Sequence, residues 1–238
     1  MTIKPSSADG QQPTEAPTGK ILEDTKSAHE IYDEDYFIYG RRSKKSLYDN
    51  YRWLPSLTVP MAQTIVDHCG IELDDTILDF GCARGYLVKA LVSINHIAYG
   101  HDVSKWALEH ADPSVASLLQ NNWPTTAKFD WIIAKDVLEH IPLHGITHLI
   151  RQIAEVAQKG IFVVVPLAKG LGLPYVVPEY EKDVTHAIRW PLDQWVDEFI
   201  DALDHNWEIS ARYRIKGIKD NYAQFEKGNG FITCKRIG

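Results

Sequence analysis

The chain is poor in the residues that build disulfide frameworks and cysteine metal sites. Its 238 residues include three cysteines, Cys69, Cys82 and Cys234, and no two of them form a CxxC pair. No apolar run approaches the roughly 20 residues that a membrane-spanning helix needs, and the N-terminus has no apolar signal-peptide core. We therefore expect a cytoplasmic protein in a reducing compartment, with no membrane partner.

An excess of positive charge is also missing. The formal net charge is −7 at pH 7 and the isoelectric point is about 5.8. Proteins that bind nucleic acid over a broad surface are usually basic there, so we expect no nucleic-acid partner. A local basic cluster remains at 41–45, where the sequence is RRSKK. Hydrophobic residues make up 45% of the chain, which at this length suits one generous domain with a substantial core.

Composition divides the chain into three parts. Residues 1–27 are rich in Pro, Ser, Thr, Gly and Gln, which is typical of a flexible tail. Residues 28–56 predict an aromatic N-terminal cap that covers one side of the core, and part of the cap can also close over a bound ligand. The aromatic residues of the cap are Tyr32, Tyr36, Phe37, Tyr39, Tyr48, Tyr51 and Trp53. Residues 57–238 form the main domain.

Hydrophobic periodicity in the main domain predicts strands that alternate with helices. We expect helices over 57–69, 85–93, 104–111, 144–158 and 191–203. We expect strands over 76–80, 96–100, 129–134 and 161–165, a short strand near 117–120, and a closing pair over 208–218 and 230–236. This order indicates an α/β, Rossmann-like, doubly wound fold: a mostly parallel seven-stranded sheet with helices on both faces and an antiparallel C-terminal strand.

The stretch ILDFGCARGYLVKAL at Ile77–Leu91 organises the rest of the chain. It reads as a strand, a loop of small residues and the first turns of a helix. Gly81 and Gly85 permit positive φ and a close approach of a ligand, and the first amides of a helix suit an anion. Asp79 adds an acceptor for a cationic amine. Donors for an anion beside a carboxylate suit the headgroup of an amino acid.

Two further strand ends converge on this loop. Asp102 follows the second strand, 23 residues after Asp79, where a carboxylate can accept hydrogen bonds from both hydroxyls of a ribose. Lys135, Asp136 and Val137 follow the fourth strand. A ligand with an amino acid at one end and a nucleoside at the other satisfies the first two strand ends.

These motifs resemble those of the class I S-adenosylmethionine-dependent methyltransferases, in their small-molecule branch. The glycine motif is similar to DFGCARG at Asp79–Gly85, although Ala83 stands where a second glycine is often found. The ribose-binding acid matches Asp102 in YGHDVS, the fourth-strand pattern matches FDWIIAKDVLEHIP, and the last strand matches GFITCKR. The resemblance runs from about residue 57 to the end. It implies S-adenosyl-L-methionine as cofactor, bound by Asp79, Gly81, Cys82, Ala83, Gly85, Tyr86, Asp102, Val103, Asp136 and Val137.

The main rival within this fold is a NAD-dependent oxidoreductase. Its fingerprint is GxGxxG, and from Gly81 onward this sequence has Ala83 and Tyr86 at the second and third glycine positions. Asp79 also places negative charge where a pyrophosphate would lie. A second alternative is a module that binds the cofactor or its demethylated product without catalysis, since the cofactor motifs establish only a binding step.

Two histidines are candidate catalytic bases for the methyl acceptor. His140 follows the fourth strand in DVLEHIP, and His186 lies in the long loop 167–189, where residues that contact the acceptor tend to lie in this fold. Each also has a structural reading: His140 can pack beside Pro142, and His186 can anchor its loop. We place His186 slightly ahead.

A metal reading is weaker, and we assign no metal-binding residue. Asp183 and His186 are three residues apart with Glu179 and Glu181 nearby, but an acidic loop is usually a solvated surface. Cys82 is expected to line the cofactor as a small residue and not to act as a nucleophile. Asp136 either contacts the acceptor or caps the following helix.

The acceptor itself leaves little trace in the sequence. The Pro-Pro-aromatic signature of the enzymes that methylate amino groups of nucleic-acid bases is absent after the fourth strand, where KDVL stands. We expect O- or N-methylation of a small polar acceptor, such as a sugar or a secondary metabolite, enclosed by the cap and the loop 167–190.

Overall fold

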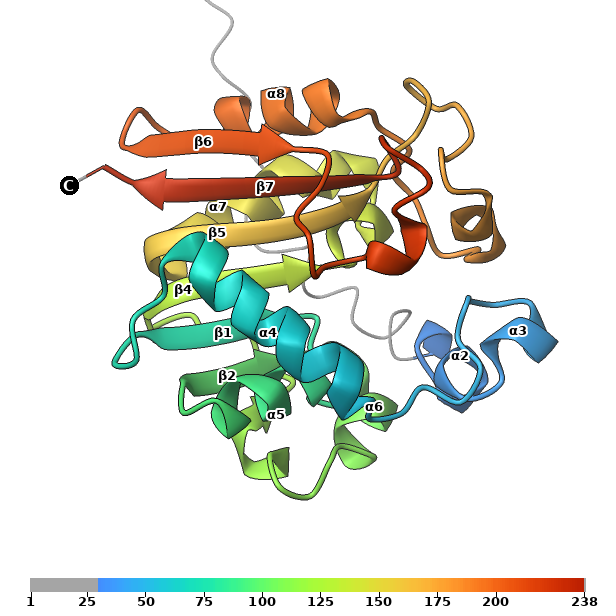
Figure 1. Cartoon of the computed structure of the whole chain (residues 1–238), viewed down its shortest axis with the longest axis horizontal. Coiled ribbons are helices and arrows are strands. Elements are labelled where there is room, and N and C mark those ends of the chain that lie inside the picture. Colours follow the sequence, from blue (N-terminus) through green and yellow to red (C-terminus); the bar gives the residue numbers. More distant parts are fainter. Residues whose placement is uncertain (1–29, 238) are drawn as a thin grey trace, which may run out of the picture.

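The computed structural model describes residues 30–237 (Figure 1). The expected flexible tail, 1–27, lies outside the described residues, as do the first two residues of the expected cap. Within the described part, no helix is both long and apolar enough to cross a membrane.

A seven-stranded sheet forms the centre of the fold, in the order β3-β2-β1-β4-β5-β7-β6. The strands are β1 (Thr76–Phe80), β2 (Ile97–His101), β3 (Leu119–Gln120), β4 (Phe129–Lys135), β5 (Ala157–Pro166), β6 (Trp207–Arg212) and β7 (Asn229–Arg236). The first five run parallel, and β7 is antiparallel to both of its neighbours. The predicted α/β class, the mostly parallel sheet and the antiparallel C-terminal strand are confirmed.

Helices cover both faces of the sheet because successive side chains of a buried strand point to opposite faces. In β4, Trp131 and Ile133 pack with α4 (Pro55–Cys69) and α5 (Tyr86–Ser93), whereas Ile132 packs with α7 (Ile146–Val156) and α8 (Leu192–Ala202). Figure 1 shows α4 crossing the near face, with α7 behind the sheet. The short helix α6 (Lys105–Glu109) is preceded by Ser104, whose hydroxyl accepts from the amide of Ala107 as expected for an N-cap.

The boundaries of several elements differ from prediction. The strand predicted over 208–218 ends at Arg212, because Ile215 and Ile218 leave the sheet and pack in the same apolar cluster as α4. Strand β5 begins at Ala157, four residues before the predicted start, and shortens the helix predicted over 144–158. Pro191 is the N-cap of α8, one position before the expected first turn.

Residues 30–56, which we call the cap, lie beyond the carboxyl ends of the parallel strands (Figure 1). Its short helices are α2 (Glu34–Phe37) and α3 (Gly40–Ser43). Tyr36 and Phe37 are buried in a cluster that includes Ala83 of the glycine loop and Ala107 of α6. The boundary at residue 57 stays a prediction, and α4 already begins at Pro55.

A close approach between two central strands depends on a glycine. Gly160 of β5 stands opposite Trp131 of β4, and a Cβ at Gly160 would lie 2.3 Å from Cζ3 of that indole. The indole is buried and belongs to the core between the sheet and α4, so it has little room to move. Only glycine fits this position without displacing the ring.

Gly160→Ala should therefore lower the free energy of unfolding by about 1–3 kcal/mol, the usual cost of overpacking a core. Chemical denaturation measures it. Gln158→Ala, at an exposed position of the same strand, is the matched control and should change stability by less than about 0.5 kcal/mol. Equal stability of the two variants would show that Trp131 is not held against β5.

Candidate functional site

A cavity of about 700 Å³ opens beyond the carboxyl ends of β1 and β4, under the cap. Its wall is formed by the glycine loop after β1, the segment after β4, the long loop after β5, the cap and the connection between β6 and β7. Ligands of open α/β sheets bind at this edge, next to the strand where the order of connection reverses. The cavity is therefore the candidate site.

The glycine loop after β1 lies against the segment after β4. Gly81 has φ of 80°, and a Cβ there would lie 2.3 Å from Cγ2 of Val137. The amides of Gly81 and Cys82 donate to the carbonyl of His101, and the amide of Gly85 donates to that of Cys82. These three amides are therefore already paired within the protein. The first amides of α5, at Tyr86 and Leu87, remain as donors, because a helix cannot pair its own first N–H groups.

Asp79 is a buried carboxylate at the head of this loop. It lines the cavity, and burial raises its pKa to about 7. The nearby ammonium group of Lys135 opposes this shift, and the carboxylate of Asp102 adds to it. Asp79 makes no ion pair among the described residues, so it can accept a cationic group of a ligand.

Asp102, at the end of β2, is more enclosed than expected. Its two oxygens accept from the amides of Ala83 and Ser104, both at 2.7 Å. The hydroxyl of Ser104 donates to the carbonyl of Tyr32, which brings the cap over this carboxylate. Asp102 is buried and does not line the cavity, and burial raises its pKa to about 6. A carboxylate has about four lone-pair sites, so two remain for a ligand if the cap withdraws.

Asp136, after β4, is held by two lysines. Its Oδ2 lies 2.5 Å from Nζ of Lys135 and 2.7 Å from Nζ of Lys219. Burial opposes its ionisation, but the two ammonium groups together hold the pKa of Asp136 well below its usual range. The short helix that follows has no side-chain cap, so the predicted capping role of Asp136 is wrong.

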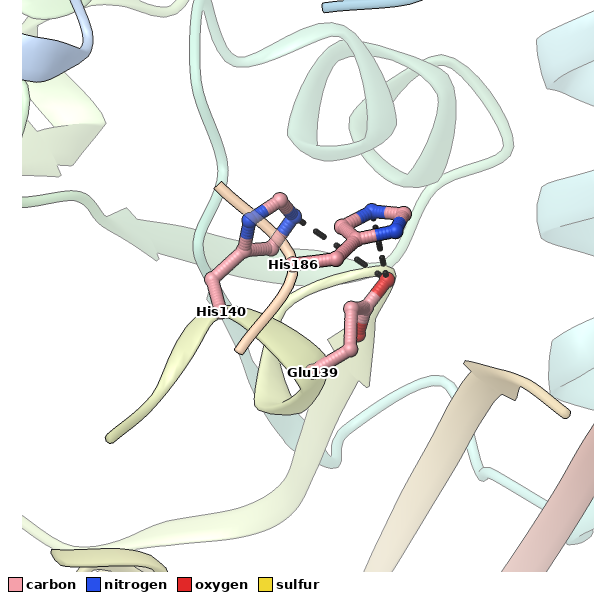
Figure 2. A group of neighbouring side chains, drawn as sticks. All are labelled: Glu139, His140 and His186. Carbon is pink, nitrogen blue, oxygen red and sulfur yellow. Dashed lines mark ion pairs between the residues drawn. The ribbon is translucent and has the colours of Figure 1, made fainter. Parts of the chain in front are cut away.

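Both candidate histidines also line the cavity, around Glu139 (Figure 2). Nε2 of His140 and Nε2 of His186 are each 4.0 Å from Oε1 of Glu139. Burial lowers the pKa of His186 to about 4 and that of His140 below its usual value, so both rings are neutral at pH 7. Burial raises the pKa of Glu139 well above its usual range.

A chain of hydrogen bonds supports His140 from behind. Its Nδ1 lies 2.7 Å from the hydroxyl of Thr185, and that hydroxyl donates to Oδ1 of Asp183 at 2.6 Å. The other carboxylate oxygen of Asp183 accepts from the hydroxyl of Tyr36 at 2.9 Å. The cap, the loop after β5 and the turn after β4 are therefore joined at His140.

The structure brings most of the predicted site residues to one cavity. Those that line it are Asp79, Gly81, Cys82, Ala83, Tyr86, Asp136, His140 and His186. Gly85, Asp102, Val103 and Val137 are not among the residues that line the cavity. Burial raises the pKa of the Cys82 thiol well above its usual value, which fits a small lining residue and not a nucleophile.

Glu181 and Asp183, two of the acidic residues considered with His186 as metal ligands, make other contacts in the structure. Glu181 is turned away, since it accepts from the amide of Tyr175 and pairs with Arg189 at 3.2 Å. Asp183 also lines the cavity, but it acts through Thr185. The carboxylate beside His186 is instead Glu139.

Three residues of the site were not predicted from the sequence. The sequence could have indicated Glu139, because it directly precedes His140 and a carboxylate can interact with a catalytic histidine. Thr185 could have been noticed as the neighbour of His186. No sequence feature indicated Lys219, since it lies in an irregular connection between β6 and β7 that only the fold places at the site.

The comparisons with known proteins agree with this geometry. A family model described as a methyltransferase domain matches residues 56–213. No curated protein matches the sequence of the chain.

Several solved structures share the fold. Magnesium protoporphyrin IX methyltransferase of Synechocystis PCC 6803, solved with S-adenosylhomocysteine (SAH), is 18% identical with a TM-score of 0.59, over 90% of this chain and 100% of that chain. The plantazolicin methyltransferase BamL, solved with SAH and a triazolic desmethylPZN analogue, is 11% identical with a TM-score of 0.58, over 92% of this chain and 98% of that chain. A putative methyltransferase in complex with the Haloferax volcanii activator Trm112 is 15% identical with a TM-score of 0.56, over 77% and 91%.

These identities are low, so the solved structures show a common fold and nothing finer. The family model covers more than half of the chain, and the sheet has the doubly wound order with an antiparallel last strand. The chain therefore belongs to the class I S-adenosylmethionine-dependent methyltransferases.

Proposed function

We propose that the protein transfers the methyl group of S-adenosylmethionine to an oxygen or nitrogen atom of a small polar acceptor. One observation carries the proposal: a single cavity is lined both by the buried carboxylate Asp79, near the end of β1, and by Glu139, His140 and His186, which come from the turn after β4 and the loop after β5. The cofactor would occupy the first wall and the acceptor the second. The sulfonium methyl group would lie between them.

The methionine end of the cofactor suits the β1 side. Asp79 would hold the ammonium group, and the first amides of α5 would meet the carboxylate. Gly81, with no side chain, leaves the loop close to Val137 and open toward the ligand. Cys82 and Ala83 contribute small side chains to the same wall.

The ribose would bind Asp102, which requires a local movement of the cap. The carbonyl of Tyr32 accepts from Ser104 next to this carboxylate. A ribose that reaches Asp102 would displace this contact, and the tyrosines of the cap would then pack over the bound nucleoside. That part of the cap closes over a ligand stays a prediction.

The acceptor would lie under the cap, on the side of the two histidines. The wall there is rich in polar groups and includes Lys135, Lys219 and Asp183, which suits a polar acceptor. Similar folds act on very different molecules, since one neighbour is named for magnesium protoporphyrin IX and another for plantazolicin. A sugar or a secondary metabolite stays our prediction for the acceptor class, and a cytoplasmic location stays a prediction as well.

The chemistry required of the protein is mainly alignment. The acceptor atom attacks the methyl carbon, the bond from that carbon to sulfur breaks, and the sulfur keeps both electrons as SAH leaves. Holding both reactants in line replaces a bimolecular encounter with a step inside one cavity. An acceptor hydroxyl must also lose its proton, and the neutral rings of His186 and His140 are the candidate groups for this step.

A binding module without catalysis is the less suitable reading. Such a module would need only the β1 and β2 side of the cavity. The continuation of the cavity to a buried carboxylate and two neutral imidazoles supports an acceptor site. Binding of NAD is disfavoured because Tyr86 stands at the third glycine position of the GxGxxG fingerprint. The carboxylate of Asp79, which has no ion-pair partner among the described residues, would also repel a pyrophosphate.

The proposal predicts that SAH binds and that NAD does not. Asp102→Asn should weaken SAH binding about 10–100-fold, because charge-assisted hydrogen bonds contribute about 1.5–3 kcal/mol. Asp197→Asn, at an exposed position on α8, is the matched control and should leave the affinity unchanged. Isothermal calorimetry measures the binding of SAH and of NAD to the unchanged protein and of SAH to each variant. Thermal unfolding confirms that both variants fold. Binding of NAD in place of SAH would overturn the proposal.

The affinity for SAH should also depend on pH. The pKa of Asp79 is raised to about 7 in the empty cavity, so the carboxylate is largely protonated below that pH and cannot attract an ammonium group. SAH affinity should therefore rise from about pH 6 to about pH 8, and Asp79→Asn should flatten this rise. If the affinity of Asp79→Asn for SAH rises with pH as steeply as that of the unchanged protein, Asp79 does not bind the amino group.

A further inference from the structure

Glu139, His140 and His186 bring one carboxylate and two imidazoles to the same wall of the cavity. They come from the turn after β4 and from the loop after β5. One ligand atom from each lies within 4.8 Å of the others, and all three side chains line the cavity. Figure 2 shows both rings facing the carboxylate.

We propose that these three side chains bind a divalent transition-metal ion. Two histidines and one carboxylate form a donor set that suits zinc and the neighbouring first-row ions and leaves a position open for another ligand. The two separations of 4.0 Å between nitrogen and oxygen exceed the about 3.4 Å expected between two ligands of a tetrahedral zinc ion. Small side-chain rotations would close this gap.

The carboxylate of Glu139 gives independent support. It is buried, and its Oε2 has no hydrogen-bond partner among the described residues. The two ammonium groups whose charges act on it, those of Lys219 and Lys135, are both ion-paired with Asp136. A buried carboxylate without a partner is costly, and an ion bound between it and the two rings would satisfy it.

The hydrogen bonds behind His140 fix the form of the ring that a metal needs. The amide and the hydroxyl of Thr185 both donate to Oδ1 of Asp183, so this hydroxyl has no proton left for the imidazole. It must accept from Nδ1–H of His140, which leaves the lone pair on Nε2, the atom that faces Glu139. A carboxylate that orients a metal-binding histidine through such a contact is a common supporting arrangement. Thr185 and Asp183 are thus positioning residues.

The role of the ion follows if the proposed methyl transfer is correct, and this part of the inference rests on it. An acceptor hydroxyl in the open position would have its pKa lowered and would release its proton to solvent. The resulting oxygen would attack the methyl carbon while the carbon–sulfur bond breaks and SAH leaves. His140 and His186 would then act as ligands and not as general bases, and the acceptor atom would be oxygen.

Metal binding can be tested without cofactor or acceptor. The whole chain, stripped with a chelator, is titrated with Co²⁺ by visible absorption and with Zn²⁺ and Mn²⁺ by calorimetry. We expect one ion per chain. Affinity should fall at least 100-fold in the double variant His140→Ala/His186→Ala and in Glu139→Gln, and about tenfold in Thr185→Val. His144→Ala, an exposed histidine close by in the sequence, is the matched control and should bind as the unchanged protein does.

SAH binding, measured in parallel, separates the two proposals and shows that each variant folds. If SAH binds but no ion does, or if the double variant binds an ion with unchanged affinity, the metal site is refuted and the proposed function stands. If an ion binds as expected but SAH does not, the proposed function fails and the metal site stands. Methyl transfer that survives complete chelation would also contradict the role of the ion.

Discussion

The contact between Gly81 and Val137 is the constraint on which the site depends. Strands β1 and β4 are neighbours in register, and their following loops meet where a Cβ on Gly81 would lie 2.3 Å from Val137. Glycine at 81 allows this close packing, and the pairing of β1 with β4 places Asp79 near the segment that carries Asp136 and Glu139. The cofactor side and the acceptor side of the cavity are thus held together by backbone packing.

The carboxylates around this cavity differ in whether an ammonium group of the protein pairs with them. Those without such a partner can bind a cationic ligand. Asp136 has two lysine partners and a strongly lowered pKa, so it is satisfied within the protein. Asp79 and Glu139 are buried with raised pKa values and no ammonium partner among the described residues. Such groups are costly to keep in an empty protein, and that cost is recovered when a ligand supplies the missing charge. We therefore expect the amino group of the cofactor at the first and an ion at the second.

The sequence was sufficient for the sheet, since buried strands and amphipathic helices leave strong periodic patterns and DFGCARG with Asp102 is specific for this cofactor class. It was less informative where tertiary contacts override local pattern. Ile215 and Ile218 lie in a segment that we predicted as strand, yet they pack in the same apolar cluster as α4. The amides of Gly81 and Cys82 both donate to the carbonyl of His101 at the end of β2, a pairing between two segments that the local sequence does not show. The grouping of Glu139 with His186, and of Lys219 with Asp136, joins segments far apart in the chain, which no local pattern records.

The most direct test of the central claim is a crystal structure of the protein with SAH. The account predicts the amino group of SAH at Asp79, the ribose hydroxyls at Asp102 with Tyr32 withdrawn from Ser104, and the sulfur facing the Glu139, His140 and His186 cluster. A complex in which SAH lies elsewhere, or in which its sulfur is turned away from that cluster, would contradict it.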